Sequence, residues 1–271
     1  MRHALLAGLM LVAAPAAAEP QFSTMERADR ESRVGAQVGL GIKYKGIDLG
    51  DATGFRGEIF GQFASHLRGG SAIGGYGHIS FSHLFIDDAD DVNGVADLVL
   101  GGFYVAGLGD RTTVTAHLGL FLPTASDSIE GLIANALAGA ERNYDLAGLA
   151  PNTTWLKLGA TLRTALGVTS FLQGDLAVDI AIDEPEGADI DPLIHLNLGV
   201  GTWLGQMALT GELAMTFNDS FGDNGDYLAS LAIGLHFTGS AHPSVAYILA
   251  FADEEGAIAH LLSATFYASF L

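Results

Sequence analysis

The chain has 271 residues and no cysteine, which excludes a disulfide scaffold and a thiolate metal site. Its 12 basic residues are outnumbered by 31 acidic ones, and a formal net charge of −19 argues against nucleic acid as a partner, since that needs a basic footprint. Only 16% of the residues are charged, and 49% are hydrophobic. This composition is more hydrophobic than is usual for a soluble protein with 36 glycines.

The N-terminus has the pattern of a secretory signal peptide. Arg2 and His3 precede an apolar run over residues 4–18, which ends in three alanines before Glu19. An anchor helix is the alternative, but the run is short for a membrane-spanning helix and contains Pro15. We therefore predict a signal peptide over residues 1–18, Sec-type export, and a mature chain that begins at Glu19.

Residues 19–32 are polar and of mixed charge, and we assign them to a periplasmic N-terminal extension. They could form a short helix, or a tail that enters the lumen if the strands that follow close into a barrel. A disordered terminus is the third possibility and the one we expect, because terminal segments without anchoring contacts are commonly disordered.

From residue 33 onward the chain alternates between apolar and polar residues. The clearest example is residues 193–203, where Ile194, Leu196 and Leu198 alternate with His195 and Asn197. A period of two indicates strands with one apolar and one polar face. Twelve such segments are predicted, at about residues 34–45, 55–66, 72–85, 95–105, 111–122, 154–166, 171–182, 193–203, 206–218, 226–237, 243–251 and 257–271.

These segments are too long for the sheets of ordinary soluble proteins. Strands in soluble domains average about five or six residues, whereas about ten are needed to cross a bilayer at a tilt. The fold class predicted for residues 33–271 is therefore all-β: a transmembrane antiparallel β-barrel of 12 strands, an even number as closed bacterial barrels require. Its predicted location is the cell outer membrane of a Gram-negative bacterium.

The connections alternate in length and charge. Five are short turns, at residues 66–71, 106–111, 166–170, 203–206 and 238–242, and they contain a single acid, Asp110. The other six, at residues 46–54, 86–94, 123–153, 183–191, 218–226 and 252–257, hold 21 of the 31 acids. This alternation predicts short periplasmic turns and acidic extracellular loops.

The acidic loops raise the question of a metal. Residues 87–91 and 183–191 offer carboxylates of the kind that Ca²⁺ prefers, but neither stretch fits an EF-hand. Solvated loops are the expected role, with divalent cations bridging to lipopolysaccharide as the alternative hypothesis. No organic cofactor is predicted, because the glycine-rich stretches lie on strands and not at strand-to-helix turns.

Two local resemblances support an outer-membrane protein. The last strand, with Phe266 and Phe270 on its apolar face, resembles the C-terminal strand recognised by the barrel-assembly machinery, although Leu271 follows the aromatic residue. The stretches GLGD at 107–110 and LGLFLPT at 118–124 resemble outer-membrane transporters associated with aromatic degradation, with Ala125 where that family has glycine. The resemblance implies a porin-like channel or transporter with membrane lipids and a small solute as partners.

The polar face of the strands collects charged residues that would point into a lumen. We predict as pore-lining residues Lys43, Arg56, Glu58, Asp97, His117, Lys157, Arg163, Asp175, Asp179, His195, Glu212 and His236. They would select small solutes for passive transport by charge and size. The alternative is a salt-bridge lattice that plugs the barrel and leaves it a structural or surface-interaction role.

Residues 123–153 are the one long insertion between predicted strands. Residues 126–143 have a helical pattern and could fold into the lumen as a constriction or lie across the rim.

An outer-membrane lipid hydrolase is the third hypothesis. His78 and Ser80 form the His-x-Ser pair that some outer-membrane lipases use as base and nucleophile. Because Ile79 and Phe81 are assigned to the lipid face, the pair should point into the lumen, away from lipid. We therefore predict that the protein is not an enzyme.

Overall fold

The structure is a computed structural model that describes residues 22–44, 52–86, 91–128, 131, 134–135, 141–185, 190–218, 227–238, 241–252 and 256–270. The predicted signal peptide and most of the acidic loops, with the proposed cation ligands at 87–90 and 186–189, lie outside these residues. In the described part of the chain, no helix has the length and apolar character needed to cross a membrane.

A single antiparallel sheet contains all the strands. They are β1 (Ser32–Tyr44), β2 (Ala52–His66), β3 (Ala72–Ile86), β4 (Val92–Val95), β5 (Leu98–Gly107), β6 (Thr112–Leu122), β7 (Thr154–Ala165), β8 (Ser170–Asp183), β9 (Leu193–Leu204), β10 (Met207–Asn218), β11 (Tyr227–Phe237), β12 (Ser244–Ala252) and β13 (Gly256–Phe270). Two short 3₁₀ helices, η1 (Arg68–Gly70) and η2 (Asn143–Leu149), complete the described elements.

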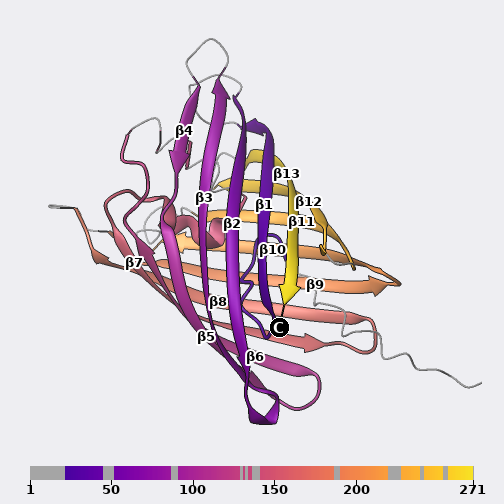
Figure 1. Cartoon of the computed structure of the whole chain (residues 1–271). Coiled ribbons are helices and arrows are strands. Elements are labelled where there is room, and N and C mark those ends of the chain that lie inside the picture. The colour runs from indigo at the N-terminus through magenta and orange to yellow at the C-terminus, as the bar shows by residue number, and fades with distance from the viewer. Residues whose placement is uncertain are drawn as a thin grey trace, which may run out of the picture.

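The sheet closes on itself. Apart from β4 and β5, each strand pairs with its neighbours in sequence. The first strand, β1, pairs with both β2 and β13, from Ser32 opposite Phe270 to Tyr44 opposite Ala259. Both β4 and β5 pair with β3, so together they make one wall strand, and the 13 described strands form a 12-strand barrel. Figure 1 shows the strands wrapped around an interior that contains η2. The predicted fold class is confirmed.

One predicted strand differs from the structure. The expected strand 95–105 begins three residues earlier and is interrupted at Ala96 and Asp97. The Asp97 carboxylate accepts hydrogen bonds from the backbone N–H groups of Thr124 (2.8 Å) and Ala125 (2.7 Å), and its own N–H donates to the Gly148 carbonyl (2.8 Å). These contacts replace ladder hydrogen bonds and anchor both ends of the long insertion to the wall.

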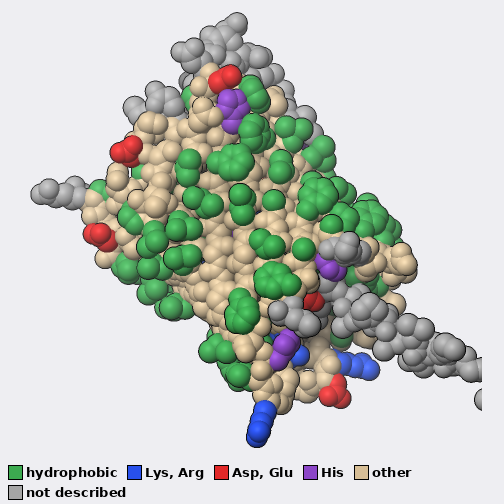
Figure 2. Space-filling model, viewed as in Figure 1, with side chains coloured by type: hydrophobic (Ala, Val, Ile, Leu, Met, Phe, Trp, Pro, Cys, Tyr) green, Lys and Arg blue, Asp and Glu red, His purple; other side chains and the backbone are tan. Residues whose placement is uncertain are grey.

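The alternation seen in the sequence sorts side chains between the two faces of the wall. On β9, Ile194 and Leu196 are 41% and 52% exposed, whereas His195 and Asn197 are 0% and 2% exposed. Hydrophobic side chains cover the middle of the outer face in Figure 2, and the basic side chains in view gather at its lower end. The outer face is therefore suited to lipid and the inner face is polar.

Candidate functional site in the barrel lumen

The N-terminal extension lies inside the barrel. Residues 22–31, which we call the N-terminal plug, follow the inner face, and Phe22 and Met25 are only 1% and 0% exposed. The Glu212 carboxylate accepts hydrogen bonds from the backbone N–H groups of Ser23 (3.1 Å) and Thr24 (2.8 Å). The sequence left open a short helix, a tail that enters the lumen and a disordered terminus. The described residues form the tail that enters the lumen, and not the disordered terminus that we expected.

Arg27 joins the plug to the wall. Its guanidinium pairs with Glu58 on β2 and donates to the Gln37 side chain on β1, and it lies 4.4 Å from the centre of the Phe60 ring. Glu58 also accepts a hydrogen bond from Arg56 at 2.7 Å. A buried carboxylate shared by two guanidinium groups is neutralised locally, which offsets much of the cost of its burial.

A second segment enters the lumen from the long insertion. Residues 141–149, which we call the inward loop, run through η2. Arg142 pairs with Asp145 at 2.7 Å within the loop and lies 3.7 Å from Glu58 on the wall. Asn143 donates to the Ala214 carbonyl at 3.0 Å. The predicted helix over 126–143 lies largely outside the described residues, although Gly131, Ala134 and Asn135 are helical.

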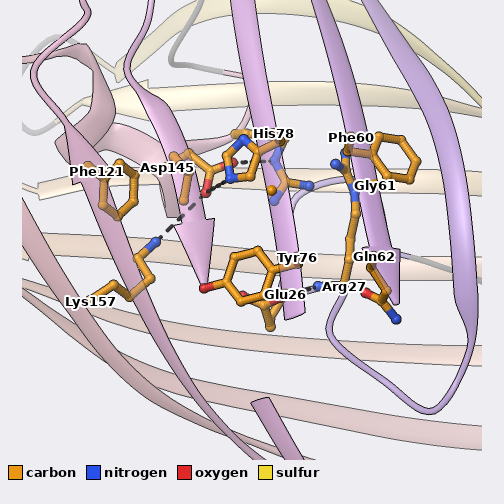
Figure 3. A pocket seen from close by; sticks show the side chains of 13 residues that line it. Glu26, Arg27, Phe60, Gly61, Gln62, Tyr76, His78, Phe121, Asp145 and Lys157 are labelled. Carbon is orange, nitrogen blue, oxygen red and sulfur yellow. Dashed lines mark hydrogen bonds and ion pairs between the residues drawn. The ribbon is translucent and has the colours of Figure 1, made fainter. Parts of the chain in front are cut away.

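Lys157 on β7 links the inward loop to Asp179, its cross-strand neighbour on β8. Its ammonium lies 3.8 Å from Asp145 and 3.7 Å from Asp179, and it donates to the Tyr144 carbonyl. Asp179 in turn pairs with His195 at 2.9 Å. In Figure 3 the Lys157 ammonium and the His78 ring both point toward Asp145, above the Tyr76 ring in this view. The network crosses the whole lumen.

Asp145 is the inward-loop carboxylate that this network stabilises. Burial alone would raise the pKa of Asp145, but the positive charges of Arg142, His78, Lys157 and Arg56 hold that pKa well below its usual range. Asp145 is therefore ionised at neutral pH and acts as the acceptor that fastens the loop.

Inward glycines make room for both entering segments. A Cβ placed at Gly199 on β9 would lie 2.6 Å from the Phe22 ring and 2.8 Å from the Met25 sulfur. One placed at Gly39 on β1 would lie 2.2 Å from the Glu141 carboxylate. Any side chain at either position would collide with the contents of the lumen.

Little space remains between the plug, the inward loop and the wall. The central cavity, lined by Arg27, Tyr76, His78, Asp145 and Lys157 among others, has a volume of about 30 Å³, and a neighbouring one beside Asp97 has about 10 Å³. A single buried water needs roughly 10–15 Å³. In this conformation the centre of the described lumen holds a few waters but no organic solute.

Eleven of the twelve predicted pore-lining residues have described side chains. Ten are buried on the inner side: Arg56, Glu58, Asp97, His117, Lys157, Asp175, Asp179, His195, Glu212 and His236. Arg163 is partly exposed near the short turns, where its guanidinium lies 4.9 Å from the centre of the Phe171 ring. The side chain of Lys43 lies outside the described residues. Their role in selectivity stays a prediction.

His78 and Ser80 also lie on the inner face, as predicted. His78 lies 4.0 Å from Glu58 and 3.8 Å from Asp145, and these three residues could present ligand atoms to one metal ion. Arg27, Arg56 and Arg142 already pair with the same two carboxylates, so the group does not have the unpaired negative charge that a divalent cation requires.

The sequence reasoning missed the residues that fill the lumen. These residues lie on segments without the alternation of a strand, so the sequence pattern could not assign them to the inner or the outer face. They are Glu26, Arg27, Glu141, Arg142 and Asp145. The available signal was indirect: glycines at Gly39 and Gly199 on otherwise polar inner faces leave space for another segment.

Comparison of the architecture with solved structures identifies the fold. The chain superimposes on an outer-membrane channel from Pseudomonas putida F1 with a TM-score of 0.70 and 15% identity, covering 93% of this chain and 100% of that one. The chain has the fold of an outer-membrane β-barrel. No family model matches it, and no curated protein matches it. The predicted resemblance to outer-membrane channels is thus confirmed at the level of the fold.

Two further structures show how widely this fold is used. The barrel resembles a KdgM porin in complex with disordered oligogalacturonate, with a TM-score of 0.53, 8% identity, and coverage of 88% of this chain and 99% of that one. It also resembles the translocator domain of the autotransporter NalP from Neisseria meningitidis, with a TM-score of 0.51, 11% identity, and coverage of 90% of both chains. Function must therefore be argued from the lumen.

Proposed function

We propose that this outer-membrane β-barrel is a gated channel for passive, selective transport of small solutes, and that the described conformation is its closed state. The observation that carries the proposal is the kind of contact that fills the lumen. Hydrogen bonds and ion pairs such as Arg27 to Glu58 and Lys157 to Asp145 fasten the N-terminal plug and the inward loop to the wall. The apolar contacts of the plug are those of Phe22, Met25 and Ala28. Neither segment contributes a strand to the wall.

A polar plug of this kind can leave without unfolding the barrel. The wall is held by continuous ladders between neighbouring strands, and those ladders do not depend on residues 22–31. Water that enters as the plug withdraws can solvate the released charges, which offsets the loss of their ion pairs. The apolar surface exposed on opening is limited to small clusters such as that of Phe22, Met25 and Phe171. The exposed inner face would then present the predicted pore-lining residues to solutes.

The decisive experiment compares single-channel conductance of the mature chain with that of a variant lacking residues 19–31. Both are refolded and inserted into planar bilayers, with heat-modifiable gel mobility as the check on folding. We expect low or flickering conductance for the mature chain and stable, larger openings for the variant. Arg163→Ala and Asp179→Ala in the truncated background should shift ion selectivity in opposite directions, because they remove charges of opposite sign.

Silence from both proteins, each shown to be folded, would contradict the gated channel. That outcome would favour the second candidate, a permanently plugged barrel with a structural or surface-interaction role at the outer membrane, in contact with lipopolysaccharide. The specific observation in its favour is the central cavity of about 30 Å³, which is too small for any solute.

A further inference from the structure

A second, larger cavity lies at the mouth of the lumen where the short turns are. Its volume is about 330 Å³, which is within the range of small-molecule pockets. Inward-facing residues of four consecutive strands line it, among them Thr113 on β6, Arg163 on β7, Phe171 on β8 and Trp203 on β9. Thr113 is directly opposite Arg163 in the sheet, so one side of the pocket is built on the rigid wall, while the turns that follow β5 and β7 supply the rest of the lining.

Positive charge converges on this pocket from three parts of the fold. Arg30 comes from the N-terminal plug, Arg111 from the turn between β5 and β6, and Arg163 from the wall. Among the described residues that line the pocket, Asp110 is the one acid, and it is exposed at the tip of that turn. A chain with a net charge of −19 thus gathers three of its 12 basic residues at one cavity.

Neutral hydrogen-bonding groups complete the lining. Thr113, on the inward parity of β6, and Thr169, in the turn between β7 and β8, line the pocket beside the arginines. The buried Nε atom of Arg30 has no hydrogen-bond partner in the described structure. A buried donor of this kind is costly unless a ligand or water accepts from it.

An aromatic surface orients one of the arginines. The Arg163 guanidinium lies over the buried Phe171 ring, with 4.9 Å between the guanidinium carbon and the ring centre. Partly exposed Trp203 adds a second aromatic face to the lining. Guanidinium groups oriented in this way present planar pairs of donors, the geometry that matches carboxylate and phosphate.

We propose that this cavity, the turn-end vestibule, binds small organic or inorganic anions that carry two or more negative charges as carboxylate or phosphate. The proposal rests on the proposed channel function for any role in transport, but the binding itself does not. Since Arg30 belongs to the plug whereas Arg111 and Arg163 belong to the barrel, a bound anion bridges the two. Occupancy therefore stabilises the plugged conformation.

The test begins with equilibrium binding to the folded full-length mature barrel in detergent at low, fixed salt. Citrate and inorganic phosphate are titrated, with calorimetry and tryptophan fluorescence as readouts, because Trp203 lines the vestibule whereas Trp155 is buried in a different cluster. We expect both anions to compete for one site, with affinity that falls as salt is added. Arg111→Gln and Arg163→Gln should each weaken binding about tenfold, and Asp110→Asn should tighten it.

Arg68→Gln is the matched control, because Arg68 is an exposed arginine at the same end of the barrel but does not line the vestibule. It should bind like the unmodified protein. Equal weakening by Arg68→Gln, or binding that no vestibule variant changes, would overturn the site, as would no binding at all by a folded barrel. Binding by one anion alone, without competition from the other, would overturn the shared recognition of carboxylate and phosphate.

Conductance distinguishes this proposal from the gated channel. Anion added on the turn side should lower the open probability of the full-length protein and leave the variant lacking residues 19–31 unaffected, because that variant has no Arg30. Anion binding without any conductance would support the vestibule as a binding site and contradict the proposed channel. Conductance without binding would reject the vestibule alone, and an anion that raised the open probability would overturn the bridging role of Arg30.

Discussion

At the residue scale, the interior is a set of charges that neutralise one another. Glu58 forms ion pairs with Arg27 and Arg56. Asp145 forms ion pairs with Arg142 and Lys157. Removing one of these two carboxylates takes a counter-charge from two buried cations, and breaking a buried ion pair typically costs about 3–5 kcal/mol. If the barrel is gated as proposed, each wall charge that contacts the plug or the inward loop also stabilises the closed state.

The lowered pKa of Asp145 predicts how the closed state depends on pH. A depressed pKa means that the stabilising contribution is complete above the ordinary aspartate value of about 3.9 and is lost as pH falls toward the lower native pKa. Conductance of the mature protein should thus stay low from about pH 7 to about pH 5. Asp145→Asn should raise it at both values, because Arg142 and Lys157 lose their partner in the loop. A steep rise in the unmodified protein over this interval would count against Asp145 as the fastening group.

At the scale of elements, strand periodicity explains how the wall forms. Inward-facing glycines explain how the wall accommodates the plug and the inward loop. Inward positions of a barrel this size would ordinarily hold large polar side chains. Gly199 on β9 and Gly39 on β1 instead leave space that Phe22, Met25 and Glu141 occupy. The strands and the segments that they enclose are thus matched in shape at particular residues.

Gly199→Val tests this match. The added side chain would overlap Phe22 and Met25, so we expect the plug to be displaced and the conductance to rise, while the barrel keeps its heat-modifiable mobility. The control is Gly211→Val on β10, whose added Cβ would meet nothing nearer than a Val200 methyl at 4.0 Å on the lipid-facing side. Equal conductance of the two variants would indicate that the plug does not control the pore.

At the scale of the whole molecule, the barrel separates a lipid-facing surface from a charged interior, and this placement bears on the lipid-hydrolase hypothesis. Ser80 is 5% exposed and lies on the inner face, with His78 between two carboxylates. A phospholipid in the bilayer would contact Ile79 and Phe81, which are exposed on the other side of the same strand.

The folded barrel should therefore release no fatty acid from phospholipid vesicles, and Ser80→Ala should behave like the unmodified protein. Free fatty acid measured by chromatography is the readout, with an established phospholipase as the positive control. Hydrolysis that disappears in Ser80→Ala would restore the enzyme hypothesis.

Alternation between neighbouring residues is enough to predict the wall of the barrel. A period of two can be recognised from neighbouring residues alone, so Ile194, His195 and Leu196 are enough to assign the two faces of β9. The number of strands follows from counting such alternating runs. The way in which the lumen is filled could not be predicted in this manner. Arg27 meets Glu58, and Asp145 meets Lys157, across the closed barrel and from segments without periodicity. Alternation assigns a side chain to a face, but the partner of a buried charge depends on chain closure, which brings distant residues together only after the wall has formed.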